Sequence, residues 1–175
     1  MADETAQTFY LKDYTPFGFD VESVELTFRL APETTRVLSK IRFVPNPNAP
    51  DRHFFLHGEK LRLISSRING EAVTPVLTDT GLTCDVPDQP FIWEAEVEIN
   101  PQANTALEGL YMSNGMYCTQ CEAEGFRKIT WFLDRPDVMA TYKVRLEADK
   151  EKFPVLLSNG NKIESGESQG EDGRT

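Results

Sequence analysis

Alternation of apolar and acidic residues is the feature that most constrains the fold of this chain. In the run "FIWEAEVEI", residues 91–99, the odd-numbered positions carry apolar side chains, and Glu94, Glu96 and Glu98 fall between them. Successive side chains of a β-strand point to opposite faces of a sheet. This period of two therefore predicts a strand with one buried face and one face in water.

The same period recurs in residues 21–30, 35–44 and 141–148. In "KLRLISSRI", residues 60–68, apolar residues fall on both faces, so we expect a strand that is buried on both sides. No long segment shows a helical period. Many short strands at regular spacing predict an all-β fold, a sandwich or open barrel with antiparallel pairing.

Turn signals lie between the predicted strands. Asn-Gly pairs are typical of tight hairpin turns because both residues tolerate positive φ. The chain has three of them, Asn69-Gly70, Asn114-Gly115 and Asn159-Gly160. The segment "VPNPNAPD", residues 44–51, carries three prolines and is therefore expected to form a loop.

The composition limits the classes of partner. The chain has 175 residues, which suit one domain or two small ones, and its 39% hydrophobic content is typical of a soluble globular protein. Its net charge of −10 repels phosphate backbones and anionic lipid, so we expect no nucleic-acid partner and no membrane partner. A cationic ligand, such as the amino group of a peptide, would be attracted.

Several features predict a cytoplasmic location. No apolar stretch approaches the roughly 18 residues that span a bilayer. The start, "MADETAQTFY", lacks the basic and apolar regions of a signal peptide, and three cysteines do not make a disulfide framework. We expect residues 1–9 to be flexible and residues 10–175 to form one β-domain. The polar end, residues 164–175, is either a flexible terminus or a hairpin cut before its partner strand.

Two short motifs imitate metal and redox sites. "HFFLH" places His53 and His57 four residues apart, but zinc peptidase ligands at that spacing need a helix and a glutamate after the first histidine. "CTQC" places Cys118 and Cys121 in a C-x-x-C, but a redox pair needs a helix N-terminus, and no second C-x-x-C completes a zinc ribbon. We expect no metal site in this chain, and idle or buried thiols.

The run "QCEAEG", residues 120–125, is the remaining candidate. If it is extended, Gln120, Glu122 and Glu124 project from one face, and Cys121 and Ala123 project from the other. The polar face is then either a solvated acidic edge balanced by Arg127 and Lys128 or a site for a primary ammonium group. A carboxylate and an amide oxygen would hold such a cation through charge-assisted hydrogen bonds.

The segment "GLYMSNGMYCTQCEAEGFRKITWFLDRPDV", residues 109–138, closely resembles the N-terminal domain of the bacterial aminopeptidase N family of zinc metallo-aminopeptidases. The resemblance continues through "FPVLLSNGNKIESGE" downstream and through "YLKDYTPFGFDVESVELTFRL" and "LHGEKLRLISSRING" upstream, so it covers almost the whole chain from about residue 10.

The resemblance implies a curved, saddle-like β-domain that packs over a catalytic domain. It implies that Gln120 and Glu122 bind the free N-terminus of peptide substrates, and it carries no such role to Glu124. The family's zinc-binding His-Glu-x-x-His helix does not occur in this chain. We therefore expect a truncated piece of a zinc aminopeptidase that is inactive alone, with zinc bound by the missing catalytic domain. The alternative is a stand-alone β-sandwich that binds a protein partner without catalysis.

Overall fold

The computed structural model describes residues 10–167, and the predicted flexible residues 1–9 and the last residues of the polar end lie outside this range. The described part contains strands and two short 3-10 helices, with no α-helix. No helix in this part of the chain is long and apolar enough to cross a membrane. The elements are η1 (Leu11–Asp13), β1 (Phe19–Arg29), β2 (Thr35–Pro45), β3 (Phe55–His57), β4 (Arg62–Ile68), β5 (Glu71–Ala72), β6 (Val76–Leu77), β7 (Gly81–Thr83), β8 (Phe91–Ile99), β9 (Gly109–Ser113), β10 (Met116–Gln120), η2 (Phe126–Lys128) and β11 (Thr141–Glu147). The predicted all-β fold class is thus confirmed.

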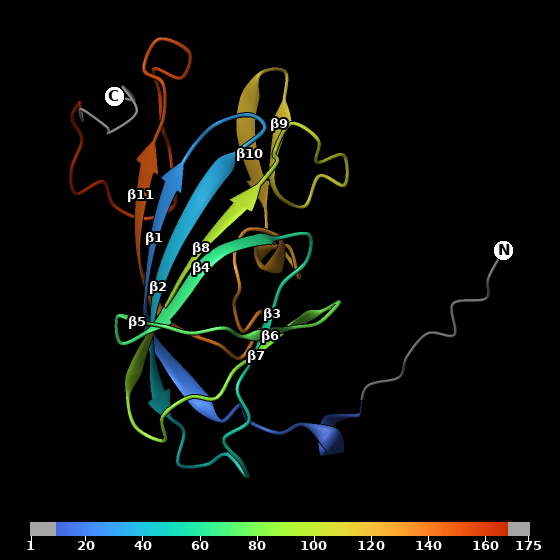
Figure 1. Cartoon of the computed structure of the whole chain (residues 1–175). Helices are drawn as coiled ribbons and strands as arrows, with labels where there is room; N and C mark the ends of the chain where they lie inside the picture. The colour runs from blue at the N-terminus through green and yellow to red at the C-terminus, as the bar shows by residue number, and fades with distance from the viewer. Residues whose placement is uncertain (1–9, 168–175) are drawn as a thin grey trace, which may run out of the picture.

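One twisted sheet of six strands dominates the molecule (Figure 1). Its strand order is β11-β1-β2-β8-β4-β5. Strands β1, β2 and β8 are the longest. Burial alternates with the predicted period of two along β2 and β8 and along β1 from Val24 onward, and a register shift between Val21 and Ser23 interrupts it in β1. Strands β3, β7 and β6 form a second, three-stranded sheet, and β9 and β10 form a separate hairpin.

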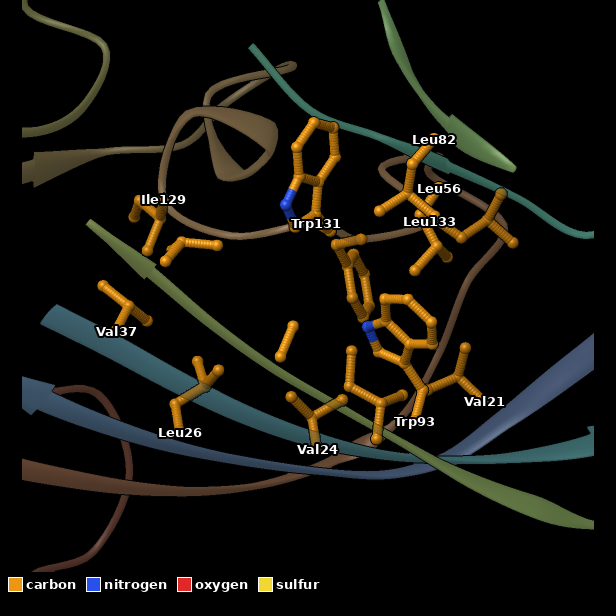
Figure 2. Close-up of a cluster of buried hydrophobic side chains, with 14 of the residues drawn as sticks. Val21, Val24, Leu26, Val37, Leu56, Leu82, Trp93, Ile129, Trp131 and Leu133 are labelled. Atoms are coloured by element: carbon orange, nitrogen blue, oxygen red, sulfur yellow. The ribbon is translucent and has the colours of Figure 1, made fainter. Parts of the chain in front are cut away.

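The hydrophobic core lies on the inner face of the six-stranded sheet. Val24, Val37 and Trp93 project from β1, β2 and β8 toward a layer that includes Leu56 of β3 and Trp131 (Figure 2). All five side chains are at most 3% exposed. The segment that follows η2 therefore serves as part of the second layer, and the position of η2 depends on the core.

Strand β4 differs from its prediction. The register of β4 on β8 shifts between Leu63 and Ser65, where the strand has an irregularity of the β-bulge kind. Leu63 lies opposite the inward-facing Val97, and Ser66 lies opposite the inward-facing Ala95. A bulge adds one residue to one strand and so reverses its alternation. The prediction of burial on both sides is wrong. The bulge changes which alternate positions of β4 face the core, so residues on both sides of it face the same buried side of the sheet.

Two further predictions need correction. Strand β11 pairs with β1 in parallel, so the expected antiparallel pairing has one exception. It is an edge strand, and Tyr142 and Val144 remain exposed on it. Asn69-Gly70 and Asn114-Gly115 both have positive φ and connect paired strands, as predicted. No strands of the described chain flank Asn159-Gly160, so the third predicted hairpin is not seen there.

Candidate amine-binding site

The candidate residues lie at the end of the β9–β10 hairpin. The tight turn at Asn114-Gly115 sets the register, which runs from Met116 opposite Ser113 to Gln120 opposite Gly109. Strand β10 ends at Gln120, where the chain leaves the hairpin and turns toward η2. Gln120 is therefore the last residue that the hairpin holds in place.

The expected extended conformation of residues 120–125 is wrong after Gln120. Residues 122–125 form a turn in which the Gly125 amide donates to the Cys121 carbonyl at 2.8 Å, and the Glu122–Ala123 peptide bond is cis. A Cβ on Gly125 would lie 2.3 Å from the Gln120 carbonyl oxygen, which is closer than non-bonded atoms approach. The turn thus folds back onto the end of β10, and only glycine fits at this crossing.

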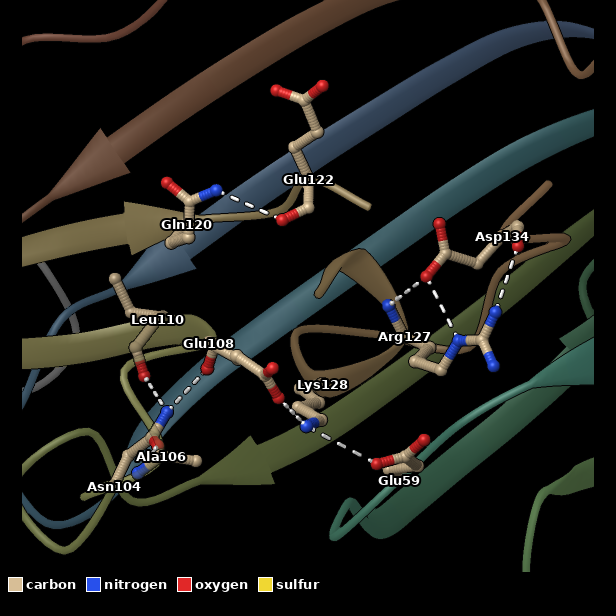
Figure 3. Close-up of polar contacts among 10 residues, drawn as sticks. All are labelled: Glu59, Asn104, Ala106, Glu108, Leu110, Gln120, Glu122, Arg127, Lys128 and Asp134. Carbon is tan, nitrogen blue, oxygen red and sulfur yellow. Dashed lines mark hydrogen bonds and ion pairs between the residues drawn. The ribbon is translucent and has the colours of Figure 1, made fainter. Parts of the chain in front are cut away.

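The turn still presents Gln120 and Glu122 together to solvent. The Gln120 side-chain nitrogen donates to the Glu122 carbonyl oxygen at 3.0 Å, which leaves the amide oxygen of Gln120 as an acceptor. The Glu122 carboxylate points away from Arg127 and Lys128 (Figure 3). Within residues 10–167 this carboxylate has no hydrogen-bond or ion-pair partner.

Glu124 is arranged differently, although the extended conformation would place it on the same face. Its carboxylate lies 3.3 Å from the Arg127 guanidinium. Of the two carboxylates, Glu122 is therefore the one available to a ligand.

A first brace joins η2 to the segment after it. The Asp134 carboxylate accepts hydrogen bonds from the backbone amide and from Nε of Arg127, both at 3.1 Å, and Arg127 Nη2 donates to the Asp134 carbonyl oxygen at 3.0 Å (Figure 3). Ion pairs that combine several hydrogen bonds are geometrically specific. This brace fixes the C-terminal side of the turn.

A second brace lies on the other side of η2. The Lys128 ammonium contacts the Glu108 carboxylate and lies 3.5 Å from the Glu59 carboxylate. The hydrogen bond with Glu108 raises the pKa of Lys128 and lowers the pKa of Glu108. The side-chain amide of Asn104 donates to the carbonyl oxygens of Glu108 and Leu110, at 2.7 and 2.9 Å, and so holds the loop that leads into β9.

His53 and His57 are not brought together on a helix. His57 lies in β3, and its Nδ1 accepts a hydrogen bond from the Asp134 backbone amide at 3.2 Å. Burial lowers the pKa of His57, and the Arg127 guanidinium lowers it further. His53 is exposed in the loop before β3. His57 therefore has a structural role next to the first brace.

Cys118 and Cys121 are both free thiols and lie in β10 and directly after it. Burial raises the pKa of the Cys121 thiol, and the Asp134 carboxylate adds to this effect. A redox-active C-x-x-C needs a lowered pKa instead. Across residues 10–167, no group of three or more His, Cys, Asp or Glu side chains is placed to hold a metal ion.

Sequence reasoning missed the residues that position the turn. Gly125 ends the run "QCEAEG", and Asp134 and Glu108 lie within or next to residues 109–138, but their contacts depend on the folded path of the chain. The only available signal was charge: Arg127 and Lys128 follow the acidic run, and we expected them to balance it. Arg127 does pair with Glu124, but it also pairs with Asp134, outside that run. Lys128 pairs with Glu59 and Glu108, which also lie outside the run.

Comparison with known proteins identifies relatives of this chain. The chain is 46% identical over 174 residues to aminopeptidase N of Caulobacter vibrioides, covering 97% of this chain and 20% of that protein. It is 43% identical over 163 residues to aminopeptidase N of Escherichia coli, covering 92% of this chain and 18% of that protein. The chain therefore spans about a fifth of the length of these curated relatives.

Solved structures give the same answer for the fold. The crystal structure of Legionella pneumophila aminopeptidase A in complex with aspartic acid matches 88% of this chain and 19% of that chain, with a TM-score of 0.82 and 34% identity. An M1 zinc metallopeptidase from Deinococcus radiodurans matches 76% of this chain and 33% of that chain, with a TM-score of 0.63 and 19% identity, and at that identity it shows the fold alone. The sequence profile of the peptidase M1 N-terminal domain matches residues 20–175. This chain therefore belongs to the family of peptidase M1 N-terminal domains.

Proposed function

We propose that this chain is the N-terminal domain of a zinc aminopeptidase that removes N-terminal residues from peptides, and that Gln120 and Glu122 anchor the α-amino group of the substrate. The similarity to aminopeptidases N supports the activity. One observation carries the role of the two residues. The Glu122 carboxylate is exposed and lacks a partner within residues 10–167, and the exposed Gln120 side chain is hydrogen-bonded through its amide nitrogen to the backbone carbonyl of Glu122.

The chemistry of the substrate suits this pair. A peptide α-amine has a pKa of about 7.7–8.0 and is therefore largely cationic at neutral pH. A carboxylate and an amide oxygen accept hydrogen bonds from the ammonium group, each contributing about 1.5–3 kcal/mol when a charge is involved. Anchoring the amine fixes the first peptide bond at a set distance from the anchor. An exopeptidase that removes one residue needs this arrangement.

Zinc does not fit the described residues of this chain, because they contain no suitable group of ligands. We therefore propose that the metal is held by a catalytic domain outside this chain. The residues of this chain bind and orient the amine. We also propose a cytoplasmic location, since all three cysteines are free thiols, as in proteins of reducing compartments.

The test replaces Glu122 with its uncharged isostere in the full-length enzyme. Glu122→Gln should lower kcat/KM for an aminoacyl-arylamide about 10- to 150-fold, which corresponds to about 1.5–3 kcal/mol of lost transition-state stabilisation. Glu71→Gln is the control, because Glu71 is exposed in β5, in a different sheet from the β9–β10 hairpin. Equal kcat/KM values for Glu122→Gln and the unmodified enzyme would remove Glu122 from the site.

A further inference from the structure

We propose that Arg127 and Asp134 form a positioning pair for Glu122, which sets the place and the availability of its carboxylate without contacting the substrate. This inference rests on the proposed function and adds two residues to it. The pair makes three hydrogen bonds that involve the backbone and the side chain of each residue. Both side chains are only 12% exposed, so the solvent screens the interaction little.

Both residues of the pair are hydrogen-bonded to β3 or to the residues directly after it. The Asp134 amide donates to His57 Nδ1 at 3.2 Å, and His57 and Phe132 exchange backbone hydrogen bonds of 2.8 and 3.1 Å. The Arg127 carbonyl oxygen accepts from the Glu59 amide at 3.0 Å. Strand β3 and Glu59, two residues after its end, therefore fix the positions of Asp134 and Arg127 relative to each other.

Backbone hydrogen bonds connect η2, which contains Arg127, to the turn that contains Glu122. Going back along the chain from η2, the Lys128 amide donates to the Gly125 carbonyl at 3.1 Å, and the Gly125 amide donates to the Cys121 carbonyl at 2.8 Å. Gly125 also lies against the Gln120 carbonyl, where no side chain fits. Glu122 thus lies in a turn that is closed by the Gly125–Cys121 hydrogen bond and connected to η2 by the Lys128–Gly125 hydrogen bond.

The same contacts control the charge near the site. Arg127 lies five residues after Glu122 and would compete with a substrate ammonium group if its guanidinium were free to reach that carboxylate. Asp134 and Glu124 occupy the guanidinium, and the Glu122 carboxylate points in a different direction (Figure 3). Because Asp134 and Glu124 bind the positive charge of Arg127, the Glu122 carboxylate remains available to the amine of the substrate.

A double-mutant cycle in the full-length enzyme tests the pair. Asp134→Asn keeps the side-chain shape and weakens the ion pair, so KM for an aminoacyl-arylamide should rise about 10-fold while kcat changes less. If Asp134 acts through Glu122, the same change in a Glu122→Gln background should raise KM by less than about 2-fold, because coupled residues are not additive. A purely structural role would give the same fold-change in both backgrounds.

Two further variants complete the experiment. Asp137→Asn is the matched control. Asp137 lies three residues after Asp134, pairs with Arg135 and does not contact the turn. If Asp134→Asn fails to fold, Arg127→Lys replaces it, since lysine keeps the charge but cannot form the fork of hydrogen bonds. Arg127→Lys should then give the same coupled rise in KM.

The outcomes separate this inference from the proposed function. An unchanged kcat/KM in Glu122→Gln alone would overturn both. A loss in Glu122→Gln, combined with an unchanged KM in Asp134→Asn or with multiplicative effects in the cycle, would overturn only the positioning pair.

Discussion

Strand β8 and the turn after β10 are held in place by different forces. Five side chains of β8 are buried against the core, and their position depends on apolar contacts without direction. In the turn of residues 122–125, only Gly125 is buried. Hydrogen bonds, two braces of charged residues and one close glycine contact hold the turn instead. Apolar burial supplies stability, whereas directional contacts place a few exposed polar atoms accurately.

This difference predicts that the two regions fail in different ways when they are mutated. A change in β8 should lower stability without altering the site in the folded protein. A change in the turn should cost less stability and more activity.

The largest expected effect is on stability, from Phe91→Ala in β8. Phe91 is 1% exposed, and its ring lies 5.3–5.6 Å from the rings of Phe19, Phe43 and Phe54. Removing a buried phenylalanine side chain costs about 3–5 kcal/mol, because it loses transfer free energy and leaves a cavity. Urea denaturation should show this loss, while kcat/KM of the full-length enzyme stays unchanged below the unfolding transition.

Glu94→Ala on the other face of the same strand is its control. It should change the free energy of unfolding by no more than about 0.5–1 kcal/mol, since it removes no core contact. Equal losses for Phe91→Ala and Glu94→Ala would show that the inner face of β8 does not carry the stability.

Gly125→Ala should have a smaller effect on stability and a larger one on function. A Cβ at this position meets the Gln120 carbonyl oxygen at 2.3 Å and the Cys121 Cα at 2.9 Å, so the backbone must shift. Overpacking of this kind costs about 1–3 kcal/mol. The shift also moves Glu122, and kcat/KM of the full-length enzyme should fall at least as far as in Glu122→Gln.

Gly115→Ala at the far end of the same hairpin provides the comparison. Its Cβ would meet nothing within 4 Å, although its positive φ of 80° costs about 1 kcal/mol for a residue with a side chain. Stability should fall slightly and kcat/KM should stay constant. An active Gly125→Ala enzyme would show that the turn tolerates movement.

The smallest expected effect concerns His57, where the two regions meet. Burial and Arg127 lower the pKa of His57 in the folded state below its usual value of about 6.5. The folded state therefore binds fewer protons than the unfolded state near that pH. The stabilising contribution is complete above about pH 6.5 and is lost as the pH falls through the lower folded pKa.

His57→Gln removes this titration and keeps an acceptor for the Asp134 amide. The free energy of unfolding, measured by urea denaturation from pH 7 to 5, should fall less steeply in this variant. His53→Gln is the control, because His53 and His57 are the two histidines of the chain, and it should retain the slope. Identical slopes in both variants would contradict the assignment.

Alternation in the sequence was sufficient to predict β2, β8 and the part of β1 from Val24 onward, because there a regular pleat places every second residue on one buried face. It failed in β4, where the irregularity between Leu63 and Ser65 reverses the phase. It also did not predict the parallel pairing of β11, since the partner strand lies more than a hundred residues earlier. Regular local geometry is readable from the sequence, but single insertions and distant partners are not.

The same limit applies to the site. Alternation and family resemblance selected Gln120 and Glu122, and their role in amine binding stays a prediction. The extended conformation was wrong because Gly125 contacts the end of β10 and Arg127 binds Asp134. Both contacts depend on how η2 and the segments around it pack against the end of the hairpin and against β3. No period or motif in residues 120–134 records that packing.

The most direct measurement is a crystal structure of the full-length enzyme with a bound amino acid that has a free α-amine. We predict the amine nitrogen within about 3.2 Å of a Glu122 carboxylate oxygen and of the Gln120 amide oxygen. An α-amine held by other residues, with the Glu122 carboxylate turned away from it, would contradict the account.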